Sequence, residues 1–251
     1  MIRFFLIVVI VVLFLILSIP VMLIEWLVGK FNPRAKAIRS LRIIQTAFRL
    51  ILWVAGVKVT EIGKENIPVD SPVLYIGNHR SYFDILLLYV RCHDLTGFVS
   101  KKEMNKIPLL RVWMRYLNCL FLDRENIKEG LKTILKAIEY VKSGISICIF
   151  PEGTRNKAEN DLDMMPFHDG SFKIAQKSGC PIIPVALNNT SEIFEKHFPR
   201  VKPCHVVIEY CKPIMYSELS REEQRHIGQY TQNIILNTLK KNEKLTEKVN
   251  M

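Results

Sequence analysis

The chain has 251 residues, of which 49% are hydrophobic, and its formal net charge at pH 7 is +11. This length suffices for one large domain with a real core, and the hydrophobic share is high for a soluble enzyme. The charge favours an anionic partner such as a phospholipid surface or a phosphorylated substrate, whereas nucleic acid is disfavoured because the basic residues gather beside an apolar segment without interleaved aromatic residues.

The apolar segment lies at the start of the chain, where residues 4–24 contain no charged side chain. At helical rise this stretch matches the hydrocarbon thickness of a bilayer, so we expect a retained membrane anchor. A signal peptide is less consistent with its length and with the lack of an A-x-A-like site after it. Pro20 leaves a third possibility, a kinked hairpin that lies in one leaflet.

Flanking charge indicates the orientation of this anchor. Arg3 is the one charged side chain before the stretch, whereas six Lys and Arg residues follow it between positions 30 and 49. By the positive-inside rule, the body of the protein is expected on the cytoplasmic face of the membrane.

Residues 33–55 have apolar side chains at three- and four-residue spacing and are followed by Gly56, a pattern that predicts an amphipathic helix ending there. The basic side chains of this helix allow two interpretations. It can lie along an anionic lipid surface, or it can pack on the globular domain with an ordinary solvated face.

After Gly56, predicted strands alternate with predicted helices. The strands are expected at 57–62, 73–77, 96–99, 118–122, 145–149, 182–187 and 205–211, and the helices near 83–91, 107–116, 127–142, 170–178 and 218–241. Such alternation predicts an α/β fold with a mixed, largely parallel sheet flanked by helices. We therefore expect two units, an anchor with its basic helix at 1–56 and an α/β domain at 57–251.

A polar stretch with His79, Ser81 and Asp84 follows the strand predicted at 73–77, at the kind of strand end where α/β sheets carry their chemistry. A carboxylate on one imidazole nitrogen fixes the tautomer of the ring, so that the other nitrogen can take a proton from a hydroxyl group. The alternative is that Ser81 and Asp84 form a capping box and serve only the start of the next helix.

Residues 150–155, Phe-Pro-Glu-Gly-Thr-Arg, follow the buried strand predicted at 145–149. The planar guanidinium of Arg155 suits a phosphate group, and Gly153 allows a ligand or backbone to approach closely. The alternative is a plain turn held by an ion pair between Glu152 and Arg155. Lys101 and Arg124, which follow two further strands, add cations that either assist or belong to the ordinary surface.

The cysteines and the motifs that the sequence lacks disfavour several classes of protein. The six cysteines form no C-x-x-C pair and no cluster with histidine, so we expect buried thiols and neither disulfides nor a metal site. The sequence lacks G-x-S-x-G, G-x-x-x-x-G-K-[ST], G-x-G-x-x-G and H-E-x-x-H. Serine hydrolases, P-loop enzymes, dinucleotide enzymes and zincins are thus disfavoured.

Taken in order, these stretches resemble the four motifs of the 1-acyl-glycerol-3-phosphate acyltransferase family, also called PlsC-like. The resemblance spans roughly residues 57–215, and three residues depart from the family's second motif: Met104, Arg111 and Asn118, the last two where small residues, commonly glycine, are expected. The matching stretches are Asn78-His79-x4-Asp84, Lys101–Pro108 through Phe121–Arg124, Phe150–Arg155 and Ile183–Leu187.

The resemblance implies transfer of a fatty acyl group from acyl-CoA or acyl-carrier protein to the sn-2 hydroxyl of lysophosphatidate, with no cofactor beyond that co-substrate. It implies His79 as the base, Asp84 as its orienting partner, and Arg155 assisted by Lys101 and Arg124 at the phosphate. Glu152, Gly153 and Thr154 are assigned to acceptor binding and loop shape. Alternatives are a lysophospholipid with another headgroup, or a membrane-tethered lipid-binding protein without activity.

Overall fold

The computed structural model describes residues 1–247 and contains a seven-stranded sheet in the order β1-β7-β6-β2-β5-β3-β4. Neighbouring strands are parallel except β6 and β7, which run antiparallel, so the predicted mixed, largely parallel sheet is confirmed. The strands are β1 (Lys58–Ile62), β2 (Leu74–Gly77), β3 (Thr96–Lys101), β4 (Leu120–Leu122), β5 (Ser146–Ile149), β6 (Ile182–Asn188) and β7 (His205–Tyr210).

The helices also follow the predicted pattern. Their bounds are α1 (Ile2–Leu17), α2 (Ile19–Phe31), α3 (Pro33–Ala55), α4 (Phe83–Arg91), α5 (Pro108–Tyr116), α6 (Ile127–Lys142), α7 (Lys173–Ser178), α8 (Arg221–Arg225) and α9 (Ile227–Glu247). The single helix predicted at 218–241 is divided at His226 into α8 and α9. Ser220 and Glu223 form the expected capping box at its start.

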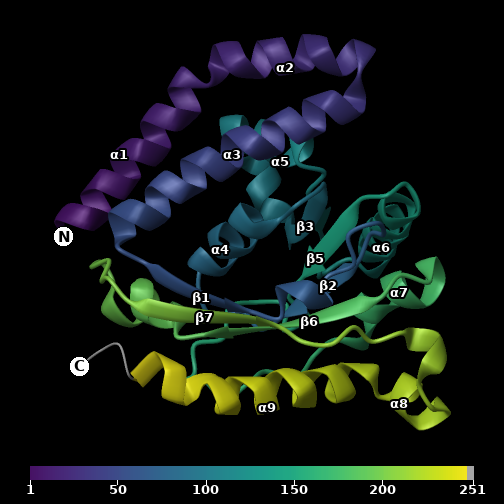
Figure 1. The fold of residues 1–251 in the computed structure, drawn as a ribbon. Helices are drawn as coiled ribbons and strands as arrows, with labels where there is room; N and C mark the ends of the chain where they lie inside the picture. Colours follow the sequence, from purple (N-terminus) through teal and green to yellow (C-terminus); the bar gives the residue numbers. More distant parts are fainter. Residues whose placement is uncertain (248–251) are drawn as a thin grey trace.

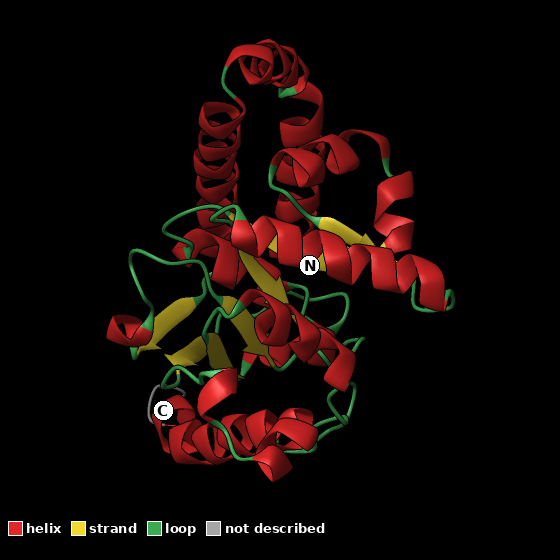
Figure 2. Cartoon of the chain, turned by 90° about the vertical axis from the view of Figure 1, so that its right-hand side faces the viewer, coloured by secondary structure: helices red, strands yellow, loops and turns green. Residues whose placement is uncertain are grey.

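Two hydrophobic cores lie on opposite faces of the sheet, and Figures 1 and 2 show helices on both sides of it. One core joins α3, α4 and α5 to the sheet through residues such as Leu87 and Trp113. The other joins α6, α7 and α9 to it through residues such as Ile138 and Leu239. Because strand side chains alternate between the two faces, Leu74 and Ile76 of β2 enter the second core.

The N-terminal apolar stretch forms two helices with a break beside Pro20, where the sequence leaves open a kink as well as a single spanning helix. α1 and α2 are bent by 49° at Ser18, and no single helix among residues 1–247 has both the length and the apolar character to cross a bilayer, although the bent pair has them together. The break has a local cause, since Pro20 carries no N–H to continue the helical hydrogen bonds. The buried hydroxyl of Ser18 donates to the Leu15 carbonyl and accepts from Trp113 Nε1 at 3.0 Å.

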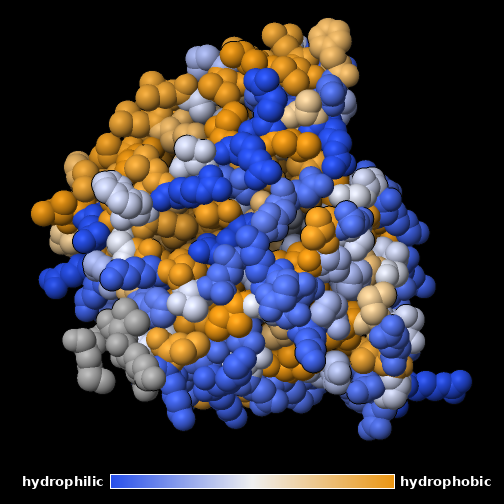
Figure 3. All heavy atoms as spheres, in the orientation of Figure 1, coloured by the Kyte–Doolittle hydropathy of each residue, from blue (hydrophilic) through white to orange (hydrophobic). Residues whose placement is uncertain are grey.

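Many apolar side chains of α1 and α2 remain on the surface, and Figure 3 shows them as a continuous hydrophobic region over these helices. Phe5 is 66% exposed and Leu17 is 69% exposed. Such a patch on one end of a molecule indicates a surface for lipid or for another protein.

Helix α3 lies between this pair and the sheet domain, which favours the second interpretation of its sequence. It buries Leu41, Ile44 and Ile51, and it ends at Gly56, whose φ of 75° provides the left-handed cap. Several of its basic side chains are engaged within the protein. Arg39 pairs with the fully buried Glu25 of α2 at 2.9 Å, for example.

Five of the six cysteines are buried and Cys204 is half-buried; all six are free thiols. Burial raises the pKa of Cys92 to about 12. These thiols are accordingly protonated near neutral pH and act as small apolar residues.

Candidate functional site

The two polar stretches singled out in the sequence meet at one edge of the sheet. β2 and β5 are parallel neighbours, so the segments that follow them emerge side by side. The backbone N–H of Asn156 donates to the His79 carbonyl at 2.8 Å, and the backbone N–H of His79 donates to Glu152 Oε1 at 2.7 Å. The stretches around His79 and Arg155 therefore form one site.

Asp84 contacts His79 and also binds backbone N–H groups of the turn before α4. The capping box offered as the alternative does not form, because the N-cap of α4 is Tyr82 and no side chain caps it. Asp84 Oδ2 lies 2.8 Å from His79 Nδ1 and accepts from the backbone N–H groups of Arg80 and Ser81, each at 2.8 Å. The carboxylate is fully buried. The Ser81 hydroxyl accepts from the N–H of Phe83, so it belongs to the turn and leaves the carboxylate free for the histidine.

The imidazole of His79 is fixed on its face as well as at its edge. It stacks on Phe150 with the ring centres 4.2 Å apart and the planes 15° apart. Gly77 makes room for this arrangement, because a Cβ there would lie 3.2 Å from the Phe150 ring. The side chain is 14% exposed, and its Nε2 has no partner within the described part of the chain. This nitrogen is the one available for proton transfer.

The segment that follows β5 is fastened over the histidine by buried polar groups. Glu152 Oε2 accepts from the N–H of Met165, so that each oxygen of this carboxylate holds a backbone group. Burial raises the pKa of Glu152, against the opposing effect of these two N–H donors. Arg80, which is 3% exposed, donates to the carbonyls of Ala158 and Asn160 and pairs with Asp161 at 2.9 Å.

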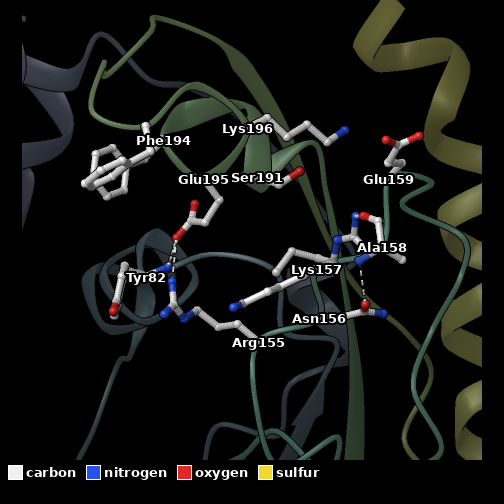
Figure 4. Close-up of a pocket in the computed structure, with 12 residues that line it drawn as sticks. Tyr82, Arg155, Asn156, Lys157, Ala158, Glu159, Ser191, Phe194, Glu195 and Lys196 are labelled. Carbon is white, nitrogen blue, oxygen red and sulfur yellow. Dashed lines mark hydrogen bonds and ion pairs between the residues drawn. The ribbon is translucent and has the colours of Figure 1, made fainter.

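A cavity of about 770 Å³ adjoins this segment and contains Arg155 on its wall. The guanidinium lies 3.5 Å from the centre of the Tyr82 ring, and its Nη1 is 3.3 Å from Glu195 Oε1 (Figure 4). The predicted alternative, an ion pair between Glu152 and Arg155, is wrong, because Glu152 is occupied by the backbone. Arg155 thus faces a space large enough for a ligand headgroup.

The same cavity has an aromatic side. Phe194 and Phe198 line it, and their rings are 5.5 Å apart. Phe194 also stacks on Phe4 of α1, again at 5.5 Å. The apolar part of the cavity therefore extends through Phe4 to α1, whereas Arg155 and Lys157 provide cations to the same cavity.

The other predicted binding residues lie at varying distances from this cavity. Lys101 is exposed at the end of β3, and Thr154 is exposed in the loop beside Arg155. Arg124 approaches the loop, since a Cβ on Gly153 would lie 3.9 Å from its guanidinium carbon. Arg124 is exposed overall, but partial desolvation lowers its pKa, and Glu103 opposes that shift. The binding roles of these residues stay predictions.

Two positions in the motif stretches require unusual backbone conformations. Gly153 has a φ of 75°, which favours glycine. Asn118 has a φ of 57°, which explains why glycine is expected at this position of the second motif and why asparagine replaces it without difficulty.

Sequence reasoning did not identify Tyr82 and Glu195 as members of the site. Tyr82 stands within the histidine stretch, but an exposed aromatic residue beside a histidine motif carries no distinctive pattern. Glu195 lies in a short 3-10 helix, Glu195–His197, far along the chain, and only the fold brings it to Arg155.

Comparison with known proteins leads to the same family as the motif stretches. A family model described as Acyltransferase matches residues 58–188, just over half of the chain. The 1-acyl-sn-glycerol-3-phosphate acyltransferase of Borreliella burgdorferi is 34% identical over 158 residues, which cover 63% of this chain and 62% of that protein. The enzyme of the same name from Haemophilus influenzae is 30% identical over 185 residues, covering 72% of this chain and 73% of that protein.

The relative from Saccharomyces cerevisiae, also named 1-acyl-sn-glycerol-3-phosphate acyltransferase, is 29% identical over 194 residues. This chain spans about three fifths of the length of several of these curated relatives. Among solved structures, the 1-acyl-sn-glycerophosphate (LPA) acyltransferase PlsC from Thermotoga maritima superposes with a TM-score of 0.80 over 96% of each chain, at 23% identity. That structure shares the fold of this chain, including its N-terminal part.

Proposed function

This chain belongs to the acyltransferase family, and from that membership we propose that it transfers a fatty acyl group to the sn-2 hydroxyl of 1-acyl-glycerol-3-phosphate, giving phosphatidic acid. The observation that carries the proposal is the contact of 2.8 Å between His79 Nδ1 and the buried Asp84 Oδ2. This pair leaves one imidazole nitrogen without a partner in the described chain, and the backbone of His79 is bonded to Asn156, which lines the cavity with its neighbour Arg155.

The reaction begins when His79 Nε2 takes the proton of the acceptor hydroxyl, as its oxygen attacks the carbonyl carbon of the acyl thioester. Asp84 holds the neutral ring in the tautomer with the proton on Nδ1 and stabilises the imidazolium that forms. The tetrahedral intermediate collapses by breaking the carbon–sulfur bond. The thiolate then leaves and receives the proton from His79, so that no enzyme nucleophile is needed.

Arg155 binds the phosphate of the acceptor in this proposal, with Lys101 and Arg124 assisting. A guanidinium suits a phosphate because its N–H groups match two phosphate oxygens. The position of Arg155 on the wall of the cavity, in the segment bonded to the backbone of His79, supports the assignment.

The acyl donor is a thioester, either acyl-CoA or acyl-carrier protein, and it is already activated toward attack. The reaction therefore requires no resident cofactor or metal ion. Both substrates carry long apolar chains, and the exposed apolar surface of α1 and α2 supports a site that receives them from a membrane. In this proposal the α/β domain lies on the cytoplasmic face of the membrane, the orientation predicted from the flanking charge.

The experiment is an assay of the purified chain in which lysophosphatidate and lysophospholipids with other headgroups are each combined with acyl-CoA and with acyl-carrier protein. We expect the phosphate monoester to be the best acceptor, and H79A to abolish transfer with the fold intact by circular dichroism. Equal rates with a choline headgroup would favour the alternative acceptor. No transfer with any combination would leave a lipid-binding protein as the function.

A further inference from the structure

The side chain of Glu195 connects the arginine of the cavity to the start of helix α4. Its Oε1 accepts from the backbone N–H of Tyr82 at 2.8 Å and lies 3.3 Å from Arg155 Nη1. Its other oxygen is buried and has no hydrogen-bond partner among residues 1–247. A carboxylate in this position is unexpected in a site for an anion, because by charge alone it weakens the binding of phosphate.

The geometry shows what the carboxylate does to the arginine. A guanidinium has two edges that can each bind two oxygens, one formed by Nη1 and Nη2 and the other by Nε and Nη2. Glu195 occupies Nη1, and the ring of Tyr82 lies against the guanidinium at 3.5 Å (Figure 4). Glu195 takes one N–H of Nη1 and Tyr82 sets the plane, whereas Nε and Nη2 have no partner among residues 1–247, so the edge that they form is the one left wholly free for a ligand.

We propose that Glu195 is a positioning residue that holds the guanidinium of Arg155 so that its Nε and Nη2 edge binds the phosphate of the acceptor. The inference rests on the proposed function, in which Arg155 is the phosphate ligand. Through its bond to the Tyr82 N–H, Glu195 also ties that edge to the turn that carries His79 and Asp84. This contact holds the phosphate site in a constant position relative to the base, His79.

A positioning role and a purely electrostatic role of Glu195 predict changes of opposite sign in the acceptor KM when the carboxylate is removed. Removing a carboxylate near an anion site by charge alone lowers the KM for the anion, whereas removing the group that orients Arg155 raises it. Glu159 provides the matched control, because it borders the same cavity, is exposed, and has no bonded partner in the described chain.

The test measures kcat, the KM for lysophosphatidate and the KM for the thioester in E195A, E195Q, E159Q, R155A and the double variant R155A/E195A. We expect E195A to raise the acceptor KM about 3- to 10-fold, a range typical of a charged hydrogen bond that is partly open to solvent. The thioester KM and kcat should stay within about twofold. E195Q keeps an acceptor oxygen for both the Tyr82 N–H and Arg155 Nη1, so its melting temperature and its acceptor KM should stay closer to the wild type than those of E195A.

The double variant separates this inference from the function on which it rests. If Glu195 acts through Arg155, then R155A/E195A has the same acceptor KM as R155A, since the two residues are coupled. Additive effects, a fall in acceptor KM in E195A, or a rise as large in E159Q would each overturn the positioning role. An unchanged acceptor KM in R155A would instead overturn the assignment of the phosphate site.

Discussion

Replacing Asp84 by asparagine tests the central pair of the site with the smallest change in shape. Asp84 Oδ2 lies 2.8 Å from His79 Nδ1, so an imidazolium there gains a Coulomb energy of about 6 kcal/mol at an effective dielectric constant of ~20. Partial exposure of the ring and relaxation of the neutral variant reduce this figure. We expect a loss of about 4 kcal/mol in the transition state, or about a thousand-fold in kcat.

The substitution should affect stability much less than activity. The amide oxygen of asparagine can still accept from the backbone N–H groups of Arg80 and Ser81, which Oδ2 now holds. The new NH2 group takes the place of Oδ1, which is buried without a partner within residues 1–247. An unpaired buried amide costs about 1–3 kcal/mol, so the melting temperature should fall by several degrees while the fold persists.

The assay is the initial rate of phosphatidate formation at saturating acceptor and thioester, with circular dichroism spectra and melting curves of the same preparations. H79A and the double variant H79A/D84N provide the control, because residues that act as a unit are not additive. The double variant should be no slower than H79A. If D84N retained more than about a tenth of the wild-type kcat, the carboxylate would serve only the backbone of the turn and the base assignment would lose its support.

Four further changes have defined outcomes. R155A should raise the KM for lysophosphatidate at least about tenfold and leave the KM for the thioester unchanged, because a charged hydrogen bond to the phosphate is lost; equal effects on both constants in initial-rate assays would contradict this. G153A should lower the free energy of unfolding by about 1–2 kcal/mol in urea titrations, because its φ is 75°. The double variant L13S/I16S, at positions 49% and 52% exposed, should reduce binding to anionic vesicles at least about tenfold without changing the melting temperature; undiminished binding in a flotation assay would place the lipid contact elsewhere. W113F should lower the free energy of unfolding by about 1–3 kcal/mol, because its indole N–H donates to the break between α1 and α2; unchanged urea denaturation would show that this contact is not needed.

The local pattern of apolar residues in the sequence was sufficient to predict much of the architecture. Each strand predicted from a short apolar run overlaps an observed one, and α3 and α4 have the predicted bounds, because hydrophobic periodicity reports which side of an element is buried. Part of the site could also be predicted from the sequence. The histidine and arginine stretches each follow a buried strand, and parallel neighbouring strands deliver such segments to one edge.

The apolar stretch at 4–24 marks the limit of this reasoning. Its composition indicates an affinity for lipid and Pro20 allows a kink, but only the structure shows that the stretch bends by 49° and that Trp113 of α5 donates to Ser18 at the break. Likewise, the packing of α3 against the sheet domain depends on partners from other elements. A hydropathy pattern records which residues are apolar and carries no information about what covers them.

By itself the sequence determined the α/β class, the two motif stretches and their family resemblance, since these depend on residue types at short spacing. Only the tertiary structure decided that Asp84 binds the histidine and the turn before α4 together, and that Glu152 bonds to backbone while Glu195 reaches Arg155. The physical reason is that charged side chains choose partners by distance in space. Chain separation says nothing about which of several carboxylates a folded backbone brings within hydrogen-bonding distance.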